Sequence, residues 1–269
     1  MLAFCSSAIT FDQDEKGLLL VCDACPQFTP GGPVRFAPLS AALGAFRFES
    51  IIYGSFTAPG ASEAVLSYYG CASHIYQHGG SVLLRKVSGS WEFVDHELSI
   101  ITDHCQTYRL HDGRDILLCQ SEDGGQGQLT NWVFTCDFND TKAGEQVLIH
   151  VSDTSGTCWD REVVGSIDKI VVGDLKGDRV SDLSVFAQSK AVHVPREARD
   201  KFGCHEHFRP SPGPYYRVDF LFNGTSFTVA PWSAGTREKL EAIGDAEVGV
   251  RLFREPHTQG DGVPLVIEH

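Results

Sequence analysis

The chain has 269 residues and a formal charge of −13 at neutral pH. Its length allows a full hydrophobic core and one domain or two, and its composition, 42% hydrophobic and 21% charged, excludes a disordered or low-complexity chain. The negative charge repels phosphate backbones and no cluster of lysine and arginine offsets it, so we expect no nucleic-acid partner. No stretch approaches the roughly 18 apolar residues of a membrane-spanning helix, so we also expect no membrane span.

The nine cysteines favour an oxidising compartment, which means a secreted, periplasmic or cell-surface location. An odd number leaves at least one thiol without a partner in the same chain. Residues 1–5 are too short to be a secretory signal, so export would require a signal removed before this numbering begins. The alternative is a cytoplasmic protein with buried thiols.

The predicted elements are nearly all strands. Two come first, at 8–11 and 17–22, and three groups of four follow, each rich in β-branched and aromatic residues with Gly, Asp and Asn between the strands. The groups occupy 50–56, 63–70, 80–87 and 91–97; 106–111, 114–120, 130–138 and 145–151; and 169–175, 182–188, 215–222 and 226–232. One helix is predicted at 236–245, where Leu240 and Ile243 share a face, and two strands at 248–253 and 263–268 end the chain.

Two of these groups share a sequence pattern. GDLKGDRVSDLSVF at 173–186 aligns without a gap with GSFTAPGASEAVLS at 54–67, and each follows an aliphatic run. The turns Ser88-Gly89 and Asn223-Gly224 lie at matching places further on. We interpret the chain as a single repeat domain, 1–269, with copies at about 48–97, 105–151 and 168–232.

The segment 173–186 resembles the FG-GAP or VCBS repeat of integrin-α-type β-propellers, in which a strand leads into a loop D-x-N-x-D-G-x-x-D and then into a second strand. The resemblance implies that each copy is one propeller blade and that loop carboxylates bind Ca²⁺. Lys176 stands where the family pattern has Asn, and Arg179 stands where it has Gly. The first copy has Ser55, Thr57 and Pro59 in place of loop carboxylates.

The expected fold is therefore an all-β propeller of four-stranded antiparallel blades with one short helix near the C-terminus. Three copies, with a closing blade built from 8–25 and 247–269, predict four blades. Five blades and an open two-sheet sandwich are the alternatives.

Asp174, Asp178 and Asp182 are the candidate calcium ligands, because spacings of four residues put three carboxylates on one tight turn. Lys176 places an ammonium where a ligand oxygen would lie, so an internal salt bridge could replace the ion. The alternative is an acidic turn stabilised by its own side-chain to backbone hydrogen bonds.

Histidines form a second candidate site. His74 and His78 follow Cys71 in the first copy, and His205 and His207 follow Cys204 at the matching place in the third. Imidazole and thiolate are Zn²⁺ ligands, although the spacing fits no zinc-finger framework. The alternatives are exposed loop histidines and a disulfide between the two matched cysteines.

Three further cysteine pairings follow from the spacing. Cys22 and Cys25 form a C-x-x-C pair without the βαβ context of a redox motif, so a structural disulfide or a thiol pair is expected there. Cys105 and Cys119 flank the short hairpin of the second copy and are the preferred disulfide. A bond between Cys119 and Cys136 is the competing choice.

No nucleophile elbow, zinc-protease motif or phosphate-binding loop is present. We therefore expect a non-enzymatic binding module that recognises a protein or a glycan through loops on one face. The alternative function is a metal-assisted hydrolase with a site of Asp and His side chains at the central channel, and a purely structural domain is a third. The four tryptophans could line a sugar site, but Trp91 and Trp132 lie in predicted strands, where packing is expected.

Overall fold

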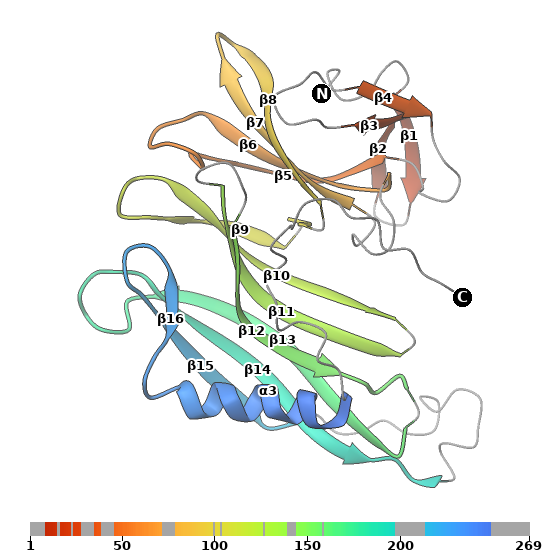
Figure 1. Ribbon diagram of the computed structural model, residues 1–269, viewed down its shortest axis with the longest axis vertical. Helices are drawn as coiled ribbons and strands as arrows, with labels where there is room; N and C mark the ends of the chain where they lie inside the picture. Colours follow the sequence, from red (N-terminus) through yellow and green to blue (C-terminus); the bar gives the residue numbers. More distant parts are fainter. Residues whose placement is uncertain are drawn as a thin grey trace, which may run out of the picture.

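The computed structural model of the protein describes residues 9–14, 17–22, 24–27, 35–38, 46–71, 79–98, 100–102, 104–125, 127–138, 144–157, 159–196 and 213–248. Within them the chain forms antiparallel β-sheets and one helix (Figure 1). The predicted all-β class and the single C-terminal helix are confirmed.

Sheet 1 has six strands in the order β1-β2-β5-β6-β7-β8. They are β1 (Ile9–Asp14), β2 (Gly17–Cys22), β5 (Phe46–Gly54), β6 (Glu63–Tyr69), β7 (Gly79–Val87) and β8 (Ser90–Leu98). A separate ribbon pairs β3 (Ala24–Gln27) with β4 (Arg35–Pro38).

Sheets 2 and 3 are four-stranded meanders, ordered β12-β11-β10-β9 and β13-β14-β15-β16. Sheet 2 contains β9 (Cys105–Arg109), β10 (Asp115–Gly125), β11 (Gln128–Asp137) and β12 (Gly144–Asp153). Sheet 3 contains β13 (Arg161–Gly173), β14 (Asp182–His193), β15 (Tyr215–Phe222) and β16 (Phe227–Val229). The predicted twelve strands of the three groups are all present.

The two ends of the chain differ from the expected closing blade. β2 pairs with β5 through Val21 opposite Arg47 and Cys22 opposite Phe46, so the N-terminal hairpin extends sheet 1. The helix α3 (Ala234–Val248) continues to Val248, where a strand was predicted to begin. That boundary is wrong because 245–248 contains no proline and includes good helix formers. The other predicted C-terminal strand residues lie outside the described residues.

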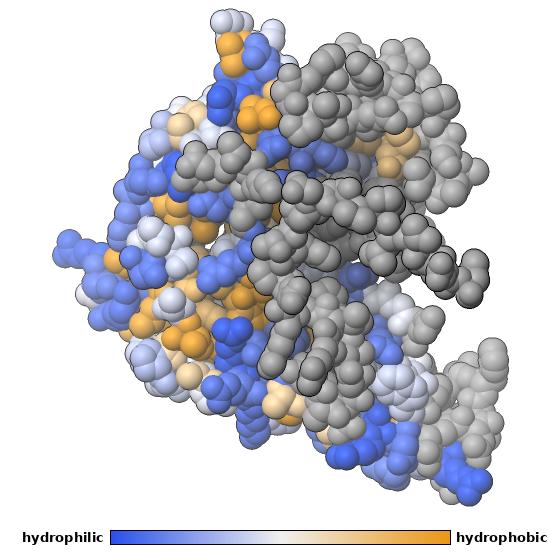
Figure 2. All heavy atoms as spheres, viewed as in Figure 1, coloured by the Kyte–Doolittle hydropathy of each residue, from blue (hydrophilic) through white to orange (hydrophobic). Residues whose placement is uncertain are grey.

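The three sheets lie one above another, with α3 at the end of the stack beside sheet 3 (Figure 1). The helix packs against β12 and against β13 to β15. Its visible surface is mainly hydrophilic in Figure 2, while Leu240 is buried in the apolar cluster between sheets 2 and 3. A second cluster joins sheets 1 and 2 through side chains that include Val65, Leu83, Leu117 and Phe134.

The hairpins β5–β6, β9–β10 and β13–β14, one in each sheet, close at a buried carboxylate. Glu63 pairs with Gly54, Asp115 with Arg109 and Asp182 with Gly173, and the carboxylate residues are 1%, 3% and 0% exposed. The hairpins β5–β6, β9–β10 and β13–β14 all turn at the left side of Figure 1. The buried carboxylates accept hydrogen bonds that hold the turns in place.

Asp115 joins two sheets. Its backbone N–H donates to the Ser55 carbonyl and its Oδ2 accepts from the Ser55 N–H, each at 2.8 Å. Next to it, Arg114 donates to the Phe56 carbonyl at 3.2 Å, and the Phe56 ring packs against Phe138. The β5–β6 loop of sheet 1 is therefore fixed to the start of β10 in sheet 2.

We expect Asp115→Ala to lower the free energy of unfolding by roughly 1–3 kcal/mol, because the Ser55 N–H loses its buried acceptor. Urea unfolding measures the change. Arg109→Ala is the matched control, since the Arg109 side chain is 63% exposed and its ion pair with Asp115 contributes at most about 1 kcal/mol. Equal decreases in the free energy of unfolding in the two variants would contradict the role of Asp115 as the buried acceptor for Ser55.

Two disulfides are present among the described residues. Cys105 bonds to Cys119, as predicted, across the directly paired strands β9 and β10. Cys25 bonds to Cys71, and Cys136 is a buried free thiol. Disulfides of this kind are typical of proteins from an oxidising compartment. No helix of the described residues has the length and apolarity to cross a membrane.

Three alternative pairings are thereby wrong. A bond between Cys119 and Cys136 fails because Cys136 lies opposite Leu117, two residues away along β10. A bond within the C-x-x-C pair fails because the sulfur of Cys25, in β3, joins Cys71 instead. The same bond excludes a disulfide between Cys71 and Cys204.

His96 on β8 and Tyr68 on β6 form a half-buried polar pair in sheet 1. The Tyr68 hydroxyl lies 2.6 Å from His96 Nε2, and the two rings stack at 5.9 Å. Burial lowers the pKa of His96 from 6.5 to about 4 and raises the pKa of Tyr68. The folded protein therefore holds a neutral imidazole at pH values where the unfolded chain binds a proton.

The free energy of unfolding is expected to fall by roughly 2 kcal/mol between about pH 7 and about pH 5 through His96 alone. Stability is lost as the pH decreases from 6.5 toward 4, because the proton binds the unfolded chain first. Urea titrations of the wild type and of His96→Gln at both pH values isolate this contribution. A variant that loses as much stability as the wild type would refute the role of His96.

Candidate functional site

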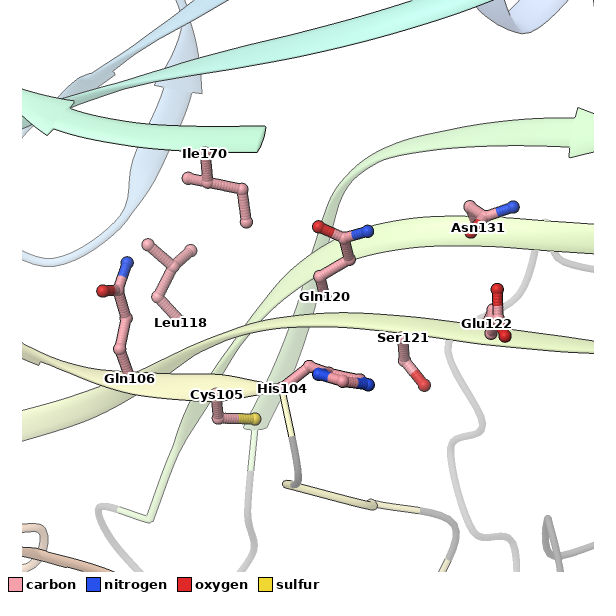
Figure 3. A pocket seen from close by; sticks show the side chains of 9 residues that line it. All are labelled: His104, Cys105, Gln106, Leu118, Gln120, Ser121, Glu122, Asn131 and Ile170. Carbon is pink, nitrogen blue, oxygen red and sulfur yellow. The ribbon is translucent and has the colours of Figure 1, made fainter. Parts of the chain in front are cut away.

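A polar cleft of about 430 Å³ opens between sheets 2 and 3 (Figure 3). It is lined by His104, Cys105, Gln106, Leu118, Gln120, Ser121, Glu122, Asn131 and Ile170. All but Ile170, which is on β13, come from β9, β10, β11 or the residue before β9.

The cleft begins where one face of β10 changes from apolar to polar. Ile116 and Leu118 face sheet 3 and are buried in the core, whereas Gln120 and Glu122 continue the same face beyond it. In Figure 3, Gln106, Leu118, Gln120 and Asn131 point toward the strand that carries Ile170, while Ser121 and Cys105 point the other way. The cleft therefore lies where β10 presents polar side chains to sheet 3 in place of apolar ones.

Gln120 still spans the two sheets at this point. Its Nε2 donates to the Ile167 carbonyl on β13 at 3.2 Å. The pairing of β13 with β14 shifts register between Ile167 and Lys169, and such a bulge bends the strand. The bent strand and the polar face of β10 together form the walls of the cleft.

The remaining lining groups are held by sheet 2. Asn131 lies opposite Glu122 and is only 7% exposed, whereas Gln106 and Glu122 are exposed. The Gln120 backbone N–H donates to the His104 carbonyl at 3.1 Å, and the Cys105–Cys119 bond ties the adjoining strands together. The site presents amide, carboxylate and imidazole groups on a rigid support, which is a hydrogen-bonding surface suited to hydroxyl groups.

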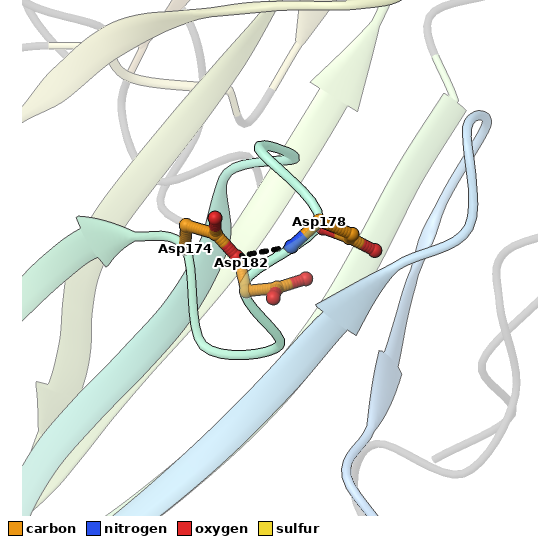
Figure 4. A group of neighbouring side chains, drawn as sticks. All are labelled: Asp174, Asp178 and Asp182. Atoms are coloured by element: carbon orange, nitrogen blue, oxygen red, sulfur yellow. Dashed lines mark hydrogen bonds between the residues drawn. The ribbon is translucent and has the colours of Figure 1, made fainter.

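The acidic hairpin loop between β13 and β14 brings Asp174, Asp178 and Asp182 together (Figure 4). One carboxylate oxygen of each lies within 4.8 Å of the others. Asp174 accepts hydrogen bonds from three successive backbone N–H groups, those of residues 177, 178 and 179, and Asp182 accepts from Leu175 and Phe222. The turn needs left-handed residues, and Arg179 adopts φ 65° where the family pattern has glycine.

Lys176 supplies a cation to this loop. Its Nζ lies 2.9 Å from Asp178 and 3.8 Å from Asp182. The hydrogen bond between Lys176 and Asp178 raises the pKa of the lysine and lowers that of the aspartate. The loop contains both an internal salt bridge and carboxylates that accept hydrogen bonds from its own backbone, which are the two alternatives that the sequence offered. A Ca²⁺ ion at this site would have to displace the ammonium group of Lys176.

The predicted histidine site lies outside the described residues. His74, His78, His205, His207 and Cys204 all belong to segments that the structure does not describe. Cys71, the one described member of that group, is bonded to Cys25.

The tryptophans separate into two kinds. Trp91 and Trp132 are partly buried against the apolar clusters, as predicted for strand residues. Trp159 and Trp232 are 40% and 59% exposed.

Sequence reasoning did not find the cleft. The sequence pattern that indicates it lies on one face of β10, where alternate residues change from apolar, Ile116 and Leu118, to polar, Gln120 and Glu122. Compared with known proteins, the chain matches no family model and no curated protein.

We expect Lys176→Asn to create Ca²⁺ affinity in the acidic loop, because it removes the competing ammonium and adds a ligand oxygen. At about 1 mM Ca²⁺ the melting temperature of this variant is expected to rise by about 3 °C, while the wild type changes by less than about 1 °C. Lys86→Asn, at an exposed lysine of sheet 1, is the control. A wild type that responds as strongly as the variant would show that Lys176 does not replace the ion.

Proposed function

We propose that the protein is a non-enzymatic binding module and that it recognises a glycan in the cleft between sheets 2 and 3. The observation that carries the proposal is the lining of that cleft, which combines amide, carboxylate and imidazole groups with two aliphatic side chains, Leu118 and Ile170. Its volume of about 430 Å³ lies in the range of small-molecule sites.

A glycan fits this lining better than a protein segment does. Sugar hydroxyl groups both donate and accept, as do the side-chain amides of Gln106, Gln120 and Asn131. A protein anchor would instead need an apolar pocket for an aromatic or aliphatic side chain, and the cleft offers only Leu118 and Ile170 for such contact.

For the architecture we propose a propeller-like array of FG-GAP or VCBS type. The alignment of 54–67 with 173–186 supports it, as do the buried carboxylates that close the hairpins β5–β6, β9–β10 and β13–β14. The sheets are antiparallel meanders of blade size, but β2 occupies the edge of β5 that would border a central channel. The array is therefore proposed as an open variant of the propeller.

For the location we propose export, to the cell surface, the periplasm or the medium. The two disulfides support this, because such bonds persist in oxidising compartments.

The metal-assisted hydrolase is the weaker proposal. Its acidic candidates, Asp174, Asp178 and Asp182, are held by backbone N–H groups and by Lys176. No observation on the described residues favours it over binding.

A glycan array followed by titration calorimetry with the best oligosaccharide tests the binding module. We expect Gln106→Ala and Glu122→Ala each to weaken binding by about tenfold, the effect of one lost hydrogen bond. Both side chains are exposed, so the fold is retained. Thr107→Ala is the matched control, because Thr107 follows Gln106 on β9, is also exposed and does not line the cleft.

An array without any hit, together with a saturable protein partner in a pull-down, would overturn the glycan assignment. Binding that survives both cleft substitutions would place the site elsewhere.

A further inference from the structure

The face of sheet 3 that points away from sheet 2 carries a row of charged and aromatic side chains. Lys169 on β13 lies opposite Phe186 on β14, which lies opposite Arg217 on β15. The Lys169 Nζ is 4.8 Å from the centre of the Phe186 ring, and the Arg217 guanidinium carbon is 5.9 Å from it. Two cations therefore flank one aromatic ring.

This face is distinct from the cleft. Strand residues alternate between faces, and Leu183, Val185 and Val218 lie on the opposite side, in the core with sheet 2. The cleft residue Ile170 is paired with Val185 and belongs to that inner side.

Asp219 fixes a tryptophan beside this row. Its Oδ2 accepts from Trp232 Nε1 at 2.9 Å, and its Oδ1 accepts from Arg217 Nε and from the Ser184 hydroxyl, each at 2.7 Å. The Asp219 side chain is 8% exposed, but the Arg217 side chain is 51% exposed and Trp232 is 59% exposed. A buried carboxylate thus holds an exposed indole and an exposed guanidinium in defined positions.

A second exposed ring extends the row along β15. Tyr215 is 66% exposed and lies two residues before Arg217, on the same face of the strand. Exposed aromatic rings cost hydrophobic free energy, so a fixed set of them marks an interaction surface. Lys169 and Arg217 place two cations on this face of an acidic chain, while the carboxylate of Asp219 beside Arg217 is nearly inaccessible.

We propose that this face of sheet 3 binds an acidic polysaccharide. The sugar rings stack on Trp232 and Tyr215, and the carboxylate or sulfate groups pair with Arg217 and Lys169. Flat apolar sugar faces fit exposed aromatic rings, and anionic substituents fit the planar guanidinium and the ammonium. The site goes beyond the proposed cleft function and does not rest on it.

The probes are polygalacturonate, its methyl-esterified form and heparin, each used in affinity electrophoresis and in calorimetry with the full chain. We expect the wild type to bind polygalacturonate or heparin, and to bind the esterified polymer at least about tenfold more weakly, since esterification removes the charge. Raising the salt concentration from about 0.05 M to about 0.5 M is expected to weaken binding further.

Trp232→Ala and Lys169→Glu are each expected to reduce the affinity by about tenfold or more. Lys169 is exposed, so Lys169→Glu is expected to fold and tests the site even if Trp232→Ala does not fold. Tyr53→Ala and Lys86→Glu, at an exposed aromatic ring and an exposed lysine of sheet 1, are the matched controls and are expected to bind normally. Gln106→Ala is also expected to bind normally, which separates this face from the cleft.

Several results would overturn the proposal. These are no binding of either acidic polymer, equal binding of the esterified polymer, and equal losses in the sheet 1 controls. A dimer in sedimentation analysis that Lys169→Glu dissociates would assign the face to a second copy of the chain instead.

Discussion

Sheet 2 must be covered on both faces, and the rest of the structure depends on this constraint. Along β10, Leu117 and Cys119 pack against sheet 1, whereas Ile116 and Leu118 pack against sheet 3. A strand buried on both sides can form only between two other apolar surfaces, so the three sheets are stacked in chain order. The cleft follows from the same constraint, because β10 is longer than its apolar part and its far end carries Gln120 and Glu122.

The hairpin turns fix how the stacked sheets meet. Ser55, in the β5–β6 loop, and Asp115 of sheet 2 exchange two hydrogen bonds, and the Tyr108 hydroxyl of sheet 2 donates to the Ser181 carbonyl in the β13–β14 loop. Directional bonds at the turns set the register that non-directional apolar packing leaves free. Between sheets 2 and 3, Leu240 of α3 joins the buried apolar cluster. The cleft lies beside this cluster, between the same two sheets.

The sequence predicted most of the local structure because that structure has local causes. The strands, the helix and the Cys105–Cys119 bond follow from β-propensity, periodicity and a short hairpin. Two non-local features were not predictable in this way. The pairing of β2 with β5 joins segments separated by a long connection, and the Cys25–Cys71 bond has a separation of 46 residues. The cleft was missed for a related reason, since Ile170 and Gln120 meet only when two sheets stack.

The distribution of charge explains how so acidic a chain presents exposed cations on one face of sheet 3. Asp115 is paired with Arg109, Asp182 lies beside Lys176, and Asp219 is paired with Arg217. These carboxylates are buried and accept backbone or side-chain hydrogen bonds. Their negative charge therefore interacts mainly with donors in the turns and in the sheet, and little of it is exposed to solvent. Asp219 shows the consequence most clearly. Its carboxylate is nearly inaccessible, while the guanidinium and the indole that it orients stay exposed, so the residue adds a negative charge to the total and still organises a surface for anions.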